Sequence, residues 1–72
     1  MRNKFDEQLS QLNTKLTDMC SSIEQAISGA VTAITKNNKE LAKEVIDLNV
    51  DIHDRERDIE TLCLKLLLQQ QP

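Results

Sequence analysis

The chain has 72 residues, of which 39% are hydrophobic and 29% are charged, and Phe5 is its only aromatic residue. A chain of this size forms one small unit at most, and with one Gly and one Pro it lacks the frequent turn residues of an all-β fold. Its net charge of −3 comes without a basic cluster, so we expect no direct binding to nucleic acid.

The sequence also lacks a membrane span and a paired-cysteine motif. No apolar run approaches the roughly 18 residues that a membrane span needs, so we expect no span and a cytoplasmic location. Cys20 and Cys63 lack the paired spacing of a zinc site or a CxxC redox motif. We interpret both as buried thiols that serve as small hydrophobic side chains.

The first predicted helix covers about residues 3–36. Apolar or small side chains recur there at alternating spacings of four and three residues, which places them on one stripe of a helix. This stripe consists of Phe5, Leu9, Leu12, Leu16, Met19, Ile23, Ala26 and Ala30.

A turn is predicted at about residues 36–38, where Lys36-Asn37-Asn38 interrupts the apolar pattern. Asn37 followed by Glu40 three positions later is typical of a capping box at the start of a helix. The second predicted helix covers about residues 38–70, and Arg55 interrupts its apolar stripe.

These elements predict an all-α fold, a long antiparallel helical hairpin whose helices are each about 50 Å long. We expect the helices to meet along an interaction seam formed by Leu9, Leu12, Leu16, Ile23, Leu41, Val45, Leu48, Ile52, Ile59, Leu62 and Leu66. The turn places Cys20 opposite about residue 54, so Cys63 lies about 13 Å further along the hairpin. An internal disulfide is therefore excluded.

A second stripe on the second helix runs beside the first one. It consists of Ala42, Ile46, Asn49, His53, Glu56, Glu60, Cys63 and Leu67. Together the two stripes cover about 160° of the helix, which is wider than a single neighbouring helix requires. We therefore expect a third helix to complete the bundle, supplied here by oligomerisation.

The middle of this second stripe is polar. Folding the hairpin brings Glu24 to the level of Asn49 and His53, and carboxylates with an imidazole on facing helices are typical of metal sites in helical bundles. Glu24, His53, Glu56 and Glu60 are therefore candidate metal ligands. The alternative interpretation is a solvated flank of an incomplete bundle, because charged stripes are usually solvated.

The opposite face of the second helix carries Asp47, Asp51, Asp54 and Asp58, which we interpret as solvated surface that could also dock a basic partner. Arg55 is expected to pair with a carboxylate across the hairpin, Asp18 or Asp51. No nucleophile beside a base and no Gly-rich phosphate loop occurs, which indicates a helical interaction module and not an enzyme.

Three segments together cover nearly the whole chain: MRNKFDEQLSQLNTKLTDM, IEQAISGAVTAITKNNKELAKEVI and IETLCLKLLLQQQP. As a set they resemble the N-terminal part of PhoU-type phosphate uptake regulators. The most specific parts of this resemblance are Arg2 with Phe5-Asp6, Met19 before Ile23-Glu24, the Leu41-Ala42-Val45-Ile46 spacing, and Glu56, Glu60 and Cys63 before Gln70-Gln71-Pro72.

The resemblance implies a protein of two tandem three-helix bundles, of which residues 1–72 form a partial bundle domain with the first two helices. It further implies a cytoplasmic, non-enzymatic negative regulator of the phosphate-starvation response that couples a phosphate ABC transporter to a sensor kinase and often dimerises. By the same resemblance, a divalent or iron-type metal is the one cofactor to consider. The acidic motif of the third helix, to which the family's metal binding is attributed, is absent from these residues.

Two residues depart from the family pattern. Asn49 and His53 stand where the family usually has aspartates, which removes one charge and replaces one hard oxygen ligand by a nitrogen. The alternative function is a self-standing coiled-coil oligomerisation module without a role in phosphate signalling.

Overall fold

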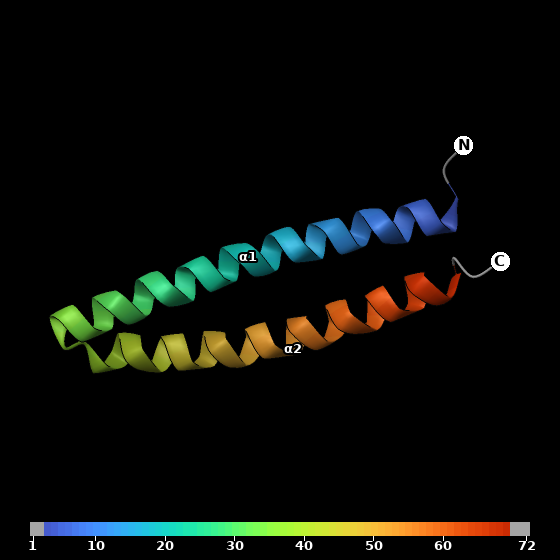
Figure 1. Cartoon of the computed structure of the whole chain (residues 1–72). Coiled ribbons are helices and arrows are strands. Elements are labelled where there is room, and N and C mark those ends of the chain that lie inside the picture. Colours follow the sequence, from blue (N-terminus) through green and yellow to red (C-terminus); the bar gives the residue numbers. More distant parts are fainter. Residues whose placement is uncertain (1–2, 70–72) are drawn as a thin grey trace.

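The computed structural model describes residues 3–69 and consists of two long helices joined by a tight turn (Figure 1). α1 covers Lys4–Lys36 and α2 covers Lys39–Gln69. The predicted all-α antiparallel hairpin is thereby confirmed. Arg2 and residues 70–72, including the predicted end of the second helix, lie outside the described residues.

The two helices form a single layer. The molecule measures 55 × 20 × 12 Å, and its smallest dimension is about the diameter of one helix with its side chains. The start of α1 and the end of α2 lie together at one end of the rod, and the turn lies at the other (Figure 1). Neither broad face of the layer is covered by a further element of the described chain.

Local signals fix the start of α1. Asn3 is its N-cap, and the Asn3 side chain accepts a hydrogen bond from the backbone N–H of Asp6 at 2.9 Å. Asp6 and Glu7 then place negative charge in the first turn, where the helix dipole favours it. The polar side chains at the N-terminus therefore determine where this helix begins.

The turn ends α1 with a left-handed residue. Asn37 has φ 50° and ψ 45°, its N–H donates to the carbonyl of Ile34, and the N–H of Asn38 donates to the carbonyl of Ala33. This pair of bonds defines a Schellman motif. The Asn38 side chain then accepts from the N–H of Leu41 at 3.0 Å, so Asn38 is the N-cap of α2. The predicted capping box starting at Asn37 is therefore wrong by one residue, because Asn37 is occupied in ending α1.

Residue 37 provides a test of this turn. We expect Asn37→Gly to raise the free energy of unfolding by a few tenths of a kcal/mol to about 1 kcal/mol, and Asn37→Ala to lower it by about 1 kcal/mol, because only alanine is strained at positive φ. Urea unfolding followed by circular dichroism at one protein concentration measures both changes. Equal effects of the two substitutions would contradict the left-handed turn.

The α2 side of the hairpin contact is made by large apolar residues. Ile52, Ile59 and Leu66 are buried. The other α2 residues of the interaction seam, Leu41, Val45, Leu48 and Leu62, are half-buried. These spacings place the α2 contact on one stripe, as its sequence pattern indicates.

The α1 side is different, because mainly small or polar residues face α2. Ser22 and Ala33 are buried. The half-buried residues are Gln8, Ala26, Gly29, Ala30 and Thr32, together with the larger Phe5, Leu12 and Met19. Of the α1 seam residues, Leu12 is half-buried, whereas Leu9, Leu16 and Ile23 are exposed. The contact line on α1 is therefore rotated by about one residue from the expected one.

Gly29 shows how closely the two helices approach. A Cβ atom added at Gly29 would lie only 2.8 Å from Cγ2 of Val45. Small side chains on α1 thus let the larger side chains of α2 pack directly against its backbone. The large side chains of α1 are consequently left on the rim of the contact and beyond it.

Candidate functional site

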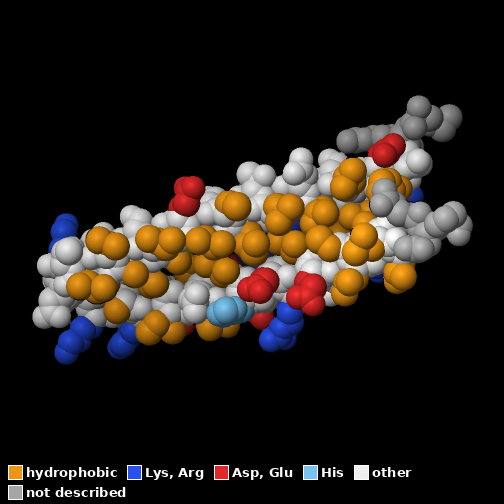
Figure 2. Space-filling model, viewed as in Figure 1, with side chains coloured by type: hydrophobic (Ala, Val, Ile, Leu, Met, Phe, Trp, Pro, Cys, Tyr) orange, Lys and Arg blue, Asp and Glu red, His pale blue; other side chains and the backbone are white. Residues whose placement is uncertain are grey.

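One broad face of the hairpin carries hydrophobic side chains on both helices, and they form a long band along α1 (Figure 2). We call this face the uncovered face. Its α1 part consists of the exposed residues Leu9, Leu16, Ile23, Ile27, Val31 and Ile34, and its α2 part of the exposed residues Ile46, Leu64 and Leu67. Soluble monomers rarely expose so long an apolar band, which marks this face as a binding surface.

The α2 part of the uncovered face is interrupted in its middle by polar side chains. Figure 2 shows acidic and histidine side chains there. Nδ1 of His53 lies 3.7 Å from Oε2 of Glu56, and both side chains are about two-thirds exposed, at 65% and 64%. At this distance and exposure the pair is weak, and the imidazole carries a charge only when protonated.

The four candidate metal ligands do not come together. Within residues 3–69, no group of three or more His, Cys, Asp or Glu side chains is placed to hold a metal ion. His53 and Glu56 are neighbours one turn apart on α2, whereas Glu24 is an exposed residue of α1. A divalent cation takes several ligands, so a metal site at Glu24, His53, Glu56 and Glu60 stays a prediction that this single weak pair does not test.

The two cysteines differ in their surroundings. Cys63 is half-buried, but Cys20 is exposed, and both are free. The interpretation of Cys20 as a buried thiol is therefore wrong. The exposed position of Cys20 agrees with the rotation of α1. By helical spacing, Cys20 lies on the uncovered face between Leu16 and Ile23.

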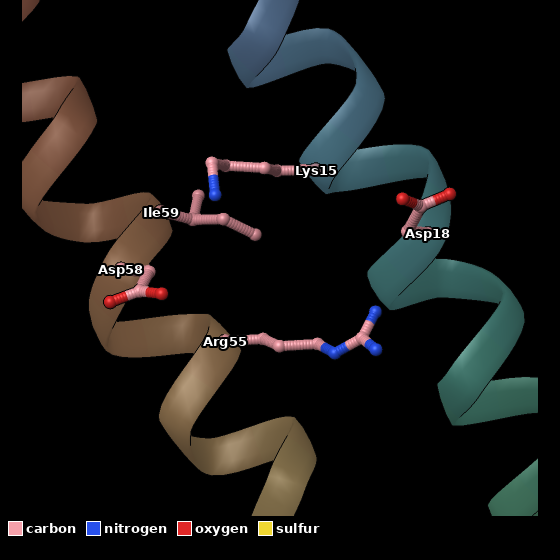
Figure 3. A pocket seen from close by; sticks show the side chains of 5 residues that line it. All are labelled: Lys15, Asp18, Arg55, Asp58 and Ile59. Carbon is pink, nitrogen blue, oxygen red and sulfur yellow. The ribbon is translucent and has the colours of Figure 1, made fainter.

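On the opposite face, a charged cleft of about 330 Å³ lies between the helices. It is lined by Lys15, Asp18, Arg55, Asp58 and Ile59. Figure 3 shows that the Lys15 and Arg55 side chains extend into it from opposite helices. Sequence reasoning missed Lys15, although Lys15 and Ile59 lie at nearly equal distances along the chain from the turn.

The charged cleft carries side chains of both signs and is open to solvent. Nε of Arg55 donates to Oδ2 of Asp51 at 3.0 Å, so Arg55 pairs with one of the two expected carboxylates, but within α2 itself and not across the hairpin as expected. The arginine and aspartate side chains are 43% and 53% exposed, and the cleft walls carry charges of both signs. Such a balanced, open cleft does not select an anion or a cation. Asp47, Asp51, Asp54 and Asp58 are all exposed.

Arg55 occupies a seam position between Ile52 and Ile59, which leads to a prediction. Arg55→Leu should raise the free energy of unfolding by about 1 kcal/mol, because an apolar side chain gains burial there and the exposed pair that it loses is worth at most about 1 kcal/mol. Thermal and urea unfolding at equal concentrations measure this gain. Asp51→Asn, which removes only the ion pair, is the matched control and should change stability by less than about 0.5 kcal/mol.

Neither α1 nor α2, as described over residues 3–69, is long and apolar enough to cross a membrane. Both helices combine apolar stripes with many charged positions.

Comparison with known proteins places the chain in a family. Residues 16–72 match the PhoU domain. The chain is 29% identical over 69 residues to the phosphate-specific transport system accessory protein PhoU of Escherichia coli K12, covering 96% of this chain and 29% of that protein. A homolog from Streptococcus pneumoniae serotype 4 is 32% identical over 72 residues, covering 100% of this chain and 33% of that protein.

A third relative, the PhoU homolog of Aquifex aeolicus, is 33% identical over 69 residues, covering 96% of this chain and 31% of that protein. The chain thus spans about three-tenths of the length of these relatives. No solved structure matches it. Because the family match extends over most of both helices and the turn, the chain belongs to the PhoU domain family.

Proposed function

We propose that this chain takes part in the regulation of phosphate uptake, and that it does so by binding other proteins and not by catalysis. The observation that carries this proposal is the uncovered face of a PhoU-domain hairpin. An apolar face of this length is typical of a protein interaction surface. The relatives from three bacteria are named as accessory proteins of a phosphate-specific transport system, which supports the phosphate part of the proposal.

In its finer form, the proposal is that the chain is a cytoplasmic negative regulator of the phosphate-starvation response. Its partners would be a phosphate ABC transporter, a sensor kinase and a second copy of the chain. The exposed aspartates of α2 and the charged cleft remain available to a polar partner when the uncovered face is occupied.

Complementation tests this role. The chain is expressed in an Escherichia coli strain that lacks its own PhoU protein, and a reporter of a phosphate-starvation promoter is measured in phosphate-rich medium. We expect the chain to lower reporter activity. An unchanged reporter, with the chain present at the same level as a functional full-length PhoU control, would contradict the proposed role.

A second candidate function is a coiled-coil oligomerisation module without a role in phosphate signalling. The 55 Å rod with an apolar stripe along α1 favours it. Self-association without any effect on the reporter would support this alternative, whereas a lowered reporter would exclude it.

A further inference from the structure

The turn end of the rod differs in charge from the rest of the chain. Lys36, Lys39 and Lys43 are exposed there, and none of them forms an ion pair with another residue that the structure describes. The stretch 25–39 contains no acidic residue, whereas residues 47–60 hold six carboxylates and two arginines. The rod is therefore polarised, with a basic end at the turn and an acidic middle on α2.

Large apolar side chains lie at the same end. Ile34 is 80% exposed, Ile46 is 63% exposed and Val31 is 56% exposed. At a rise of 1.5 Å per residue, all three lie within about 12 Å of the turn along the rod. Figure 2 shows basic side chains beside the hydrophobic ones at this end. The turn end thus combines protruding apolar groups with a rim of lysines.

The lysines of α2 and its glutamates point to different sides at this end. At about 100° per residue, Lys39 and Lys43 lie within about 60° of Ile46 around the helix. Glu40 and Glu44 lie about 120° and 160° away from Ile46. A surface that approaches Ile46 therefore meets apolar atoms and ammonium groups, and the two glutamates are turned away from it.

The size and shape of this end favour a lipid surface over a folded protein. The rod has a cross-section of 20 × 12 Å, which is about 240 Å². A stable protein interface buries about 800 Å² on each partner, so the end of the rod offers too little area for one. The headgroup region of a bilayer surrounds an inserted group on every side, and it attracts both lysines and exposed isoleucines when it contains anionic lipids.

We propose that the turn end of this hairpin binds the surface of a bilayer that contains anionic lipids. Val31 and Ile34 enter the boundary between headgroups and acyl chains, and the three lysines contact the lipid phosphates. Lysine side chains suit this position, because their apolar stems lie along apolar surface while the ammonium group stays at the polar level. The binding depends on the turn end alone and not on the regulatory role proposed above.

The acidic middle of α2 sets the orientation of the rod on the bilayer. Asp47 lies about 12 Å from the start of α2, and Asp51 lies about 18 Å from it. Salt screens the repulsion between exposed charges beyond about 8 Å at physiological ionic strength. A rod that stands on its turn end therefore keeps these carboxylates away from the anionic lipids, whereas a rod lying flat brings the middle of α2 to the surface. We expect the upright orientation.

Flotation of the 72-residue chain with lipid vesicles tests the binding. Phosphatidylcholine vesicles with about 30% phosphatidylglycerol provide the anionic surface, and pure phosphatidylcholine vesicles are the neutral reference. We expect the chain to float with the anionic vesicles and not with the neutral ones. Raising the salt concentration from about 0.05 M to about 0.5 M should weaken the binding, because the lysines act through screened charges.

Substitution of lysines at the two ends of the rod locates the binding surface. Lys39→Gln/Lys43→Gln should weaken binding about 25-fold, because each lysine near an anionic surface strengthens it about fivefold. Lys4→Gln/Lys65→Gln is the matched control, since it removes the same charge from two exposed lysines at the far end. The control should change binding by less than about twofold, and circular dichroism shows whether the helices are retained.

A second pair of variants tests the apolar contribution. Ile34→Ser should weaken binding about tenfold, because it removes an apolar side chain that leaves water on binding. Leu68→Ser is the matched control, since Leu68 is 72% exposed but lies at the far end of the rod. We expect it to bind the vesicles within about twofold of the original chain.

Three results would overturn the proposal. Equal binding to neutral and anionic vesicles would show that the lysines do not contact lipid phosphates. Equal weakening by the variants at the two ends would show that the rod does not bind through its turn. Binding to polyglutamate without binding to the anionic vesicles would assign the turn end to an acidic protein.

Discussion

Replacing Ile59 by alanine is expected to lower the free energy of unfolding by about 2–3 kcal/mol. Ile59 is only 7% exposed and lies between Ile52 and Leu66 on the α2 side of the hairpin contact. The loss combines the removed apolar surface with the space left behind. It should fall toward the lower end of the range for buried isoleucines, because a single layer of two helices lets water reach the site.

Val50→Ala is the control for this change. Val50 is also on α2, but it is 57% exposed, so its truncation should cost less than about 0.5 kcal/mol. Urea unfolding of both variants at one fixed protein concentration gives the comparison, because the stability of any chain that self-associates depends on its concentration. If Val50→Ala cost as much as Ile59→Ala, the assigned face of α2 would be incorrect.

Gly29→Ala is expected to lower the free energy of unfolding by up to about 2 kcal/mol, although alanine is the better helix former. In an open helix this substitution would add about 1 kcal/mol of stability. Here the new Cβ would meet Cγ2 of Val45 at 2.8 Å, and a β-branched valine cannot easily turn away from it. Overpacking costs about 1–3 kcal/mol, so the steric cost is larger than the gain in helix propensity.

A double-mutant cycle separates the two effects. In a Val45→Ala background the obstructing methyl group is absent, so Gly29→Ala should become stabilising by up to about 1 kcal/mol. Thermal and urea unfolding measure the effect of Gly29→Ala twice, once against the original chain and once against the Val45→Ala chain. Destabilisation of similar size in both backgrounds would show that the close approach of the helices at Gly29 is not the cause.

The candidate site shows where sequence reasoning succeeded and where it did not. The polar middle of the second α2 stripe was visible in the sequence, and His53 and Glu56 do lie together there. The sequence also placed Glu24 at the same height along the hairpin as Asn49 and His53. The height of a residue along the hairpin does not fix the direction in which its side chain points around the helix axis. Because α1 is rotated, Glu24 is an exposed residue that completes no ligand set with the α2 side chains.

The positions of the Cys20 and Lys15 side chains result from the same rotation of α1. The absence of a zinc or CxxC spacing suggested that Cys20 was a buried thiol, whereas it is exposed. Lys15 was not singled out, yet it lines the charged cleft with Arg55. Both positions depend on the angle at which α1 meets α2, and a single sequence does not specify this angle.

The sequence by itself determined the two helices, the turn and the width of the apolar stripes. These features depend on interactions between residues close in the chain, such as the Asn3 and Asn38 caps and the left-handed Asn37. Only the tertiary structure decided which part of the α1 stripe faces α2. Small residues such as Ala26, Gly29 and Ala33 allow the closest approach of the backbones, so packing selects them and leaves the larger leucines and isoleucines uncovered.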